Sequence, residues 1–227
     1  MGYWTDVNGE LSFNKPVEED FRTYLNKFYG IRHVLRDNDR IMANNSNWKD
    51  LCYNGNLGEY GEYFVGNGEY DQDEDSIIDV NHSGVFPALN CMWYVSDDGT
   101  KLLEDAEKPY GLLSSLIYII RNFLEPNGYV LNGELEYIGG GDRGKIKVAD
   151  NKVTYSGPLI VERYWDSAFP FVYDKYQPEQ EGIFDTPPTG FSFSEGIGFI
   201  SSFSVLSCLS FSFSIGVIKS YSSIFSG

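Results

Sequence analysis

The sequence predicts an α+β domain in which two helices lie on one face of an antiparallel sheet, followed by a low-complexity tail. Two segments repeat apolar residues with the period of a helix, and several short segments alternate apolar and polar residues as half-buried strands do. Along residues 1–156 these elements follow the order strand, helix, strand, strand, helix, strand, strand. With 227 residues, 42% of them hydrophobic, the chain is long enough for one domain with a core and an appendage.

The first two elements are a strand and a helix. Residues 2–13 have Tyr, Trp, Val, Leu and Phe spread along them, which is typical of a strand. Residues 14–30 are predicted to form a helix that is capped by Asn14, has Pro16 in its first turn and ends at Gly30. Its apolar stripe consists of Val17, Phe21, Tyr24, Leu25 and Phe28.

The middle of the chain is less regular. Residues 31–37 are predicted to form a short strand in which His33 lies at the surface or at an edge. Residues 38–90 are rich in Asn, Gly, Asp, Glu and Tyr, so we expect loops with one or two short strands. Residues 90–99 are predicted to form a buried strand that runs into a turn.

The second helix is predicted over residues 110–128, where Pro126 and Gly128 stop it. Residues 129–138 and 145–148 alternate apolar and polar side chains, which predicts two half-buried strands. The wide apolar face of the helix favours packing across a sheet. This face consists of Leu113, Leu116, Ile117, Ile120, Phe123 and Leu124.

The stretch between the last two strands contains the pattern G-x-G-x-x-G, at Gly139, Gly141 and Gly144. A dinucleotide-binding fingerprint needs a helix after the glycines, because the helix N-terminus holds the pyrophosphate, and here a strand follows. We therefore expect the six residues Gly139–Gly144 to form a hairpin loop. A symmetric register then places Glu136 opposite Lys147 on the solvated face and Tyr137 opposite Ile146 on the buried face.

This order of elements is the ferredoxin-like order with an extra C-terminal hairpin strand. The domain is expected to span residues 1–156. Residues 157–190 are rich in Pro, Asp and aromatic residues and are expected to form a linker or a wrapping arm. Residues 191–227 form a tail with 13 Ser and 7 Phe residues.

The tail has three interpretations. Its stretch 196–218 has no charged residue and is long enough to cross a bilayer as a helix, although it is rich in Ser and Gly. Its apolar residues occupy odd positions, a period of two that favours an extended β segment. The third interpretation is an accidental read-through or frameshifted end without a selected structure. A membrane contact is expected only through residues 196–218.

Two parts of the chain resemble an uncharacterised family of small acidic proteins that bacteriophages and bacteria, notably actinobacteria, encode. These are residues 2–13 together with the following Pro16, and residues 123–153 (FLEPNGYVLNGELEYIGGGDRGKIKVADNKV). The resemblance implies a compact α+β domain, but no known activity and no catalytic residues. Family members often have a more acidic loop in place of Gly139–Gly141, and they tend to end soon after the last strand.

Charge and cysteine content narrow the classes of function. The net charge of −16 repels nucleic-acid phosphates and anionic lipid, so direct binding to nucleic acid is not expected. Such a surface favours basic partners, divalent cations or plain solubility. The three cysteines have no C-x-x-C spacing, and the N-terminus has neither a basic start nor an apolar run. We therefore expect a reduced, cytoplasmic protein without a signal peptide.

One acidic stretch resembles a calcium loop. Asp71, Asp73, Asp75 and Asp79 occupy positions that ligate calcium in such loops, but Ser76 stands at the glycine position and the twelfth position is not Glu. These four aspartates are a weak candidate for a cation site, and the alternative is a solvated acidic loop. No other metal ligands, catalytic residues, cofactor-binding residues or cofactors are expected.

The leading hypothesis for the function is a non-enzymatic interaction protein of phage or mobile-element type, whose acidic surface docks on a basic partner protein. One alternative is a small-molecule or nucleotide-binding domain that uses the Gly139–Gly144 hairpin, with Arg143 as the counter-charge. Another is a membrane-associated protein that is anchored by its C-terminal tail.

Overall fold

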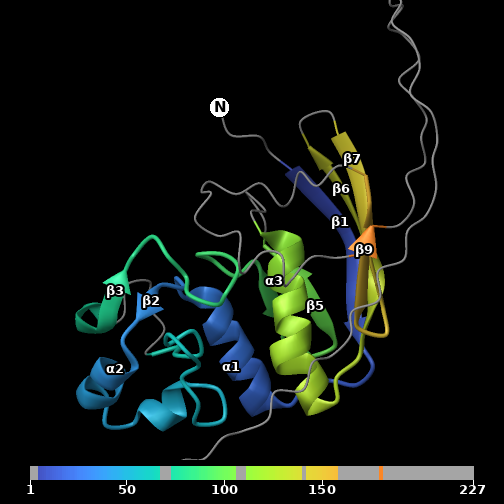
Figure 1. Ribbon diagram of the computed structural model, residues 1–227. Helices are drawn as coiled ribbons and strands as arrows, with labels where there is room; N and C mark the ends of the chain where they lie inside the picture. The colour runs from blue at the N-terminus through green and yellow to red at the C-terminus, as the bar shows by residue number, and fades with distance from the viewer. Residues whose placement is uncertain (1–4, 67–72, 106–110, 140–141, 158–178, 181–227) are drawn as a thin grey trace, which may run out of the picture. The chain divides into compact units, whose positions relative to one another are not determined.

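The structure, a computed structural model, describes residues 5–66, 73–105, 111–139, 142–157 and 179–180 (Figure 1). The chain divides into two units, Met1–Asp185 and Thr186–Gly227, and every described residue belongs to the first. The tail over residues 191–227 and most of the arm over 157–190 therefore lie outside the described residues.

The main sheet contains strands from both ends of the first unit. Its order is β4-β5-β1-β6-β7-β8-β9, and all neighbours pair antiparallel except β8 and β9, which are parallel. The longest pairing joins β1 and β6 at the centre of the sheet. The strands are β1 (Thr5–Phe13), β4 (Trp93–Val95), β5 (Lys101–Glu104), β6 (Leu131–Gly139), β7 (Asp142–Ala149), β8 (Lys152–Ser156) and β9 (Glu179–Gln180).

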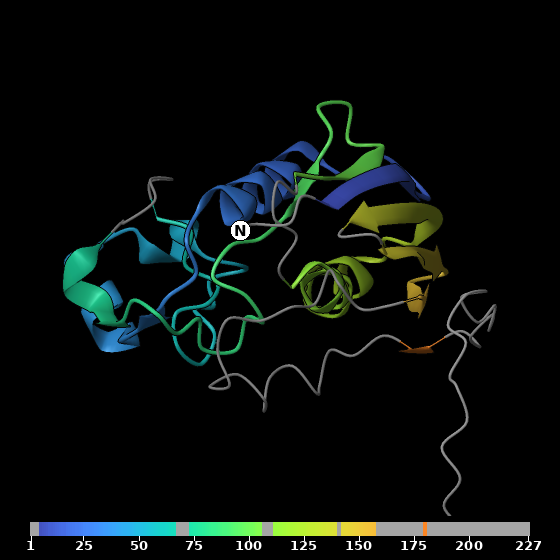
Figure 2. The same ribbon diagram turned by 90° about the horizontal axis from the view of Figure 1, so that it is seen from above.

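Two long helical segments cover one face of this sheet. These are α1 (Glu19–Gly30) and α3 (Leu112–Ile119), which continues as a π-helical turn η3 (Ile120–Leu124) and a 3-10 turn η4 (Glu125–Asn127). Figures 1 and 2 show both helices on the same side of the strands. The prediction of an α+β domain with helices on an antiparallel sheet is thereby confirmed.

The core lies between the two helices and the sheet. The predicted stripe of α1 points into it, with Leu25 and Phe28 buried, and every residue of α3 is buried. Trp93 of β4 ties the layers together, because its Nε1–H donates to the carbonyl oxygen of Leu112 at 2.9 Å. From the sheet, buried apolar side chains include Leu11, Leu102, Leu131, Leu135, Tyr137, Ile146 and Val148.

The start of α1 differs from the prediction. The helix begins at Glu19 rather than near Asn14, and no side chain caps it. Asn14 instead joins β1 to β6, because its Oδ1 accepts from the backbone N–H of Val130 at 3.0 Å and its own N–H donates to the Val130 carbonyl at 2.9 Å. The predicted acidic first turn is present as Glu19 and Asp20.

The structure also corrects the assignment of the second and third strands. Only Leu35–Arg36 of the predicted strand 31–37 is extended in a sheet, and this strand, β2, pairs with β3 (Ile77–Asp79) outside the main sheet. The main sheet instead uses β4, which lies within the predicted strand 90–99, and β5, and the two are joined by a turn in which Gly99 has φ +72°. Alternation is weak over the four residues of β5, which explains why the sequence did not predict it.

Residues 31–90 contain more helix than expected. Besides β2 and β3 they form α2 (Asn38–Asn44) and two 3-10 turns, η1 (Trp48–Leu51) and η2 (Glu74–Ser76). The carboxylate of Asp37 caps α2 by accepting from the N–H groups of Asp39 and Arg40. A small second core supports this part, consisting of Ile41, Leu51, Cys52, Leu57 and Phe64.

Candidate functional site: an acidic docking surface

The glycine-rich stretch forms a tighter hairpin than expected. β6 extends to Gly139 and β7 begins at Asp142, so Tyr137 opposes Gly144 rather than Ile146. The register differs from the expected one by two residues, which is a full strand period, and each side chain therefore keeps its expected face. Only residues 140 and 141 remain between the strands, and they lie outside the described residues.

The described part of this hairpin does not form a phosphate cradle. A strand, β7, follows the glycines, whereas a dinucleotide fingerprint needs a helix N-terminus at this place. Arg143, the expected counter-charge, has its Nε 3.7 Å from Oε1 of Glu136 on the solvated face. Gly144 serves packing, because an added Cβ would lie 2.2 Å from the ring of Tyr137.

The three predicted cation ligands that the structure describes, Asp73, Asp75 and Asp79, do not form a metal-binding group. Asp71 lies outside the described residues. The carboxylate of Asp73 accepts from the side-chain amides of Asn44 and Asn45, at 3.2 and 3.0 Å. That of Asp79 accepts from a neighbouring backbone N–H in its own turn. Across the part of the chain that the structure describes, no group of three or more His, Cys, Asp or Glu side chains could hold a metal ion.

His33 is buried, which corrects the prediction that it lies at the surface or at an edge. Its ring packs against those of Phe28 and Phe86, with both centroids 4.2 Å away, and its Nε2 is 3.0 Å from the Phe28 carbonyl oxygen. Burial lowers the pKa of His33 to about 3. The imidazole is therefore neutral at physiological pH and closed off from solvent, which suits a core residue and not a general base.

The two described cysteines are also buried. Desolvation raises the pKa of Cys52 to about 11 and that of Cys91 to about 12. Because the thiolate is the nucleophilic form, both side chains stay as unreactive thiols near neutral pH.

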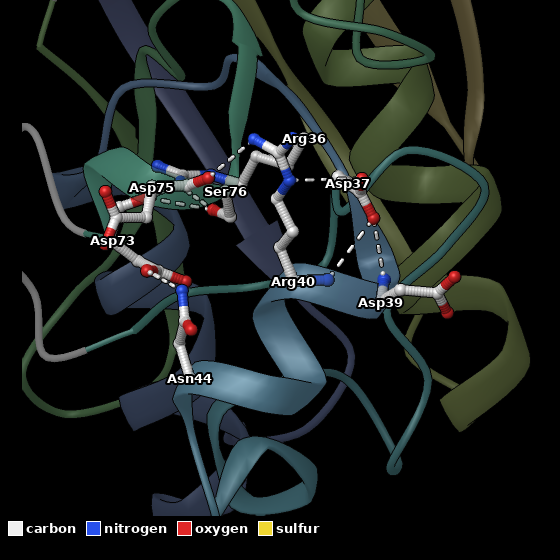
Figure 3. A network of polar contacts seen from close by, with 8 residues as sticks. All are labelled: Arg36, Asp37, Asp39, Arg40, Asn44, Asp73, Asp75 and Ser76. Atoms are coloured by element: carbon white, nitrogen blue, oxygen red, sulfur yellow. Dashed lines mark hydrogen bonds and ion pairs between the residues drawn. The ribbon is translucent and has the colours of Figure 1, made fainter.

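Three arginines hold the segment Asp73–Val80 against the rest of residues 31–90. The guanidinium of Arg36 donates to the carbonyl oxygen of Asp73 at 3.0 Å. Arg40 donates in the same way to the carbonyl of Asp75 at 3.1 Å, and Arg32 to that of Val80 at 3.0 Å. Figure 3 shows Arg36 and Arg40 reaching this segment from β2 and α2.

Arg36 is the centre of this arrangement. Its side chain is buried, and its Nη1 also donates to the buried Oγ of Ser76 at 2.8 Å. Its guanidinium lies 5.6 Å from the ring centroid of Phe64 in the second core. A buried, charge-assisted hydrogen bond of this kind fixes the η2 turn in one position.

Three acidic side chains of the segment are exposed to solvent. Because the guanidinium groups bond to backbone carbonyls, the carboxylates of Glu74, Asp75 and Asp79 remain exposed. Within the described residues none of the three forms an ion pair. Ile78 and Val80 lie among them and are 58% and 51% exposed. We call Glu74, Asp75, Ile78, Asp79 and Val80 the 74–80 surface.

The surroundings of the 74–80 surface are acidic as well. Residues 31–90, which include this surface and its three acidic residues, contain 11 Asp and Glu residues but only four Lys and Arg residues. Three of these four cations are the arginines that hold the segment, and Lys49 lies over the ring of Trp48. Exposed carboxylates next to exposed aliphatic side chains can attract and then contact a basic protein surface.

The sequence indicated part of this site. It drew attention to the acidic residues over 71–82, but as a candidate cation loop rather than as a docking surface. The three arginines were missed, because Arg32 and Arg36 lie in extended chain and Arg40 in a helix, and no local spacing shows that they converge. Exposed Ile and Val residues within an acidic stretch were the available signal.

A shallow hollow of about 390 Å³ lies on α1. The side-chain amide of Asn26 forms two hydrogen bonds with the backbone of Val95: it donates to the carbonyl oxygen and accepts from the N–H. Arg22 donates to the carbonyl of Asp97, so these groups hold α1 to the β4–β5 hairpin. We therefore assign the hollow a structural role. It is lined by Arg22, Thr23, Asn26, Lys27 and Gly30.

Comparisons with known proteins find no family model, no curated protein and no solved structure that matches the chain. The resemblance to small acidic phage and actinobacterial proteins therefore stays a prediction. Of the helices in the described ranges, none is long and apolar enough to cross a bilayer, and residues 196–218 lie outside those ranges.

Proposed function

We propose that the protein is a non-enzymatic interaction protein whose 74–80 surface docks on a basic partner protein. One observation supports this above the others: the arginines bond to backbone carbonyls, so a fixed segment presents carboxylates that no described cation neutralises. Complementary charge would speed the encounter and select the partner, while Ile78 and Val80 would lose solvent on contact.

The proposal extends to the type of protein. A phage or mobile-element origin is supported by the resemblance of residues 2–13 and 123–153 to small acidic proteins. A reducing, cytoplasmic setting is supported by Cys52 and Cys91, which are both free thiols.

We also assign the domain to the ferredoxin-like arrangement. The order β4-β5-β1-β6 with antiparallel neighbours supports this, as do α1 between β1 and β4 and α3 between β5 and β6 along the chain. On this assignment β7 and β8 are the extra C-terminal strands, added as two successive antiparallel hairpins.

The docking proposal is tested by charge reversal at the 74–80 surface. The tagged full chain captures its partner from its native cells, the captured protein is identified and purified, and the dissociation constant is measured at 50 and 300 mM salt. We expect Glu74→Lys/Asp75→Lys to weaken binding at least tenfold at low salt, because two attractions become repulsions. Ile78→Ser should raise the dissociation rate.

The matched control is Asp6→Lys/Asp97→Lys, which changes the net charge equally at two exposed positions away from this surface. It should retain most of the affinity at 300 mM salt. The docking site is wrong if both double variants weaken binding by the same factor. The non-enzymatic function is wrong if the partner is converted chemically during the incubation.

A further inference from the structure

On the face of the main sheet opposite the helices, the sign of the charged side chains changes from strand to strand. The register places Glu10 of β1 beside Glu134 of β6, Glu134 beside Lys147 of β7, and Lys147 beside Thr154 of β8. Lys145 of β7 pairs with Glu134 at 2.5 Å. The face is therefore anionic along β1 and β6 and cationic along β7.

β9 adds another anionic strand beyond the cationic ones. Glu179 lies in register beside Thr154, and Gln180 beside Tyr155. The Oε2 atom of Glu179 is 2.7 Å from Nζ of Lys152 in β8. The row that begins at Glu10 thus ends at Glu179, and the cationic strands have acidic side chains on both sides.

Without β9, β8 would be the edge of the sheet. An edge strand presents unpaired backbone N–H and C=O groups, to which an extended segment can add. Backbone hydrogen bonds alone do not discriminate between sequences, so the selectivity for one segment must come from side-chain contacts. Lys152 and the neighbouring β7 lysines favour an acidic segment here, although an exposed ion pair by itself contributes little stability.

From this arrangement we propose that the outer edge of β8 is a strand-addition site selective for an acidic extended segment, and that the chain's own Glu179–Gln180 occupies it in cis. The tether keeps the occupant at a high effective concentration. Pro178, which has no backbone N–H, directly precedes the pairing segment. The site is independent of the 74–80 surface and closes the sheet against pairing with other chains.

The test measures hydrogen exchange of the β8 amides in the full chain by NMR. Glu179→Lys and Lys152→Glu should each speed exchange of the outward-facing β8 amides, by about two- to fivefold, because like charges then face each other. The charge-swapped double variant Lys152→Glu/Glu179→Lys should return exchange to the wild-type rate. Glu125→Lys, an exposed charge reversal on η4, is the matched control and should leave the exchange rates of the β8 amides unchanged.

A synthetic peptide of residues 176–185 tests selectivity in trans. Added to the Glu179→Lys/Gln180→Pro chain, it should shift the amide resonances of β8, whereas the same peptide with Lys at positions 179 and 181 should not. Unchanged β8 exchange in Glu179→Lys overturns the proposal. So does a double variant that fails to recover, or equal binding of the two peptides, because the edge would then not select by charge.

Discussion

Gly144 lies where two strands bring side-chain and backbone atoms close together. An added Cβ would be 2.2 Å from the Tyr137 ring and 2.5 Å from the carbonyl oxygen of Ser156, and the hydroxyl of Tyr137 donates to that same oxygen. A methyl group there must displace an aromatic ring that is fully buried. This close approach accounts for the last glycine of the G-x-G-x-x-G pattern.

We therefore expect Gly144→Ala to lower the free energy of unfolding by about 1–3 kcal/mol through overpacking. Gly30→Ala is the control, because a Cβ at the end of α1 meets no atom within 4 Å. That change should be neutral or should stabilise by less than about 1 kcal/mol. Urea unfolding measures both, and a neutral Gly144→Ala would show that Tyr137 does not lie over this position.

His33 makes stability depend on pH. The unfolded chain protonates this side chain near its ordinary pKa of 6.5, whereas burial lowers the native pKa to about 3. Between these values the unfolded state binds more protons, so the free energy of unfolding falls as the pH decreases. The contribution of this one residue has a maximum slope of about 1.4 kcal/mol per pH unit.

Urea unfolding at pH 7, 6, 5 and 4 checks this prediction. Carboxylates also titrate toward the acidic end, so the informative quantity is the difference between the wild type and His33→Gln. The variant should be less stable at pH 7, because it loses the packing of the imidazole ring against Phe28 and Phe86, but its stability should decline less steeply from pH 6 to 5. Parallel profiles would indicate that His33 is accessible to protons.

At the scale of elements, α3 contributes most to the core. The segment from Leu112 to Ile120 is buried on all sides, as its wide apolar face predicted. It lies against α1 and the sheet, and Trp93 donates to its first residue, Leu112. A smaller side chain in this segment would leave a cavity that the packed neighbouring side chains do not fill.

Leu116→Ala should therefore destabilise the domain by about 2–5 kcal/mol, the usual cost of a buried large-to-small change. Glu125→Ala on the exposed η4 turn is the control and should change stability by less than about 0.5 kcal/mol. Thermal or urea unfolding measures both. A loss below about 1 kcal/mol for Leu116→Ala would mean that α3 does not face the core.

At the scale of the whole molecule, the domain should fold without its C-terminal third. The helices α1, α2 and α3 and the strands β1 to β8 lie within residues 5–156. A chain that ends at Ser156 lacks β9, so the edge of β8 is uncovered. It should still unfold cooperatively on heating, as measured by circular dichroism. A broad, non-cooperative transition would place the domain boundary further along, near Asp185, where the first unit ends.

The charge of the whole chain also predicts a negative result with nucleic acid. Asp and Glu residues number 33 against 17 Lys and Arg residues, and the cationic side chains of β7 and β8 lie between the acidic strands β6 and β9. We expect no binding to random duplex DNA or RNA at physiological salt by fluorescence anisotropy. A micromolar, salt-sensitive dissociation constant would contradict this expectation.

Sequence patterns located most elements but not their partners. The helical stripes of α1 and α3 and the alternation of β6 and β7 were visible because burial on one face repeats with a local period. The pattern did not show that residues 31–37 would pair with 77–79 outside the main sheet. It did not place β5 beside β1, because strand pairing depends on contacts between residues far apart in the sequence.

For the candidate site, too, the sequence determined some features and the tertiary structure decided others. The sequence by itself determined the α+β class, the two helices, the alternation of β6 and β7 and the acidic stretch over 71–82. The tertiary structure decided that Arg32, Arg36 and Arg40 bond to carbonyls of that stretch and leave its carboxylates exposed. It also decided the burial of His33. Periodicity and charge are local properties, whereas exposure and hydrogen-bond partners are set when distant segments pack together.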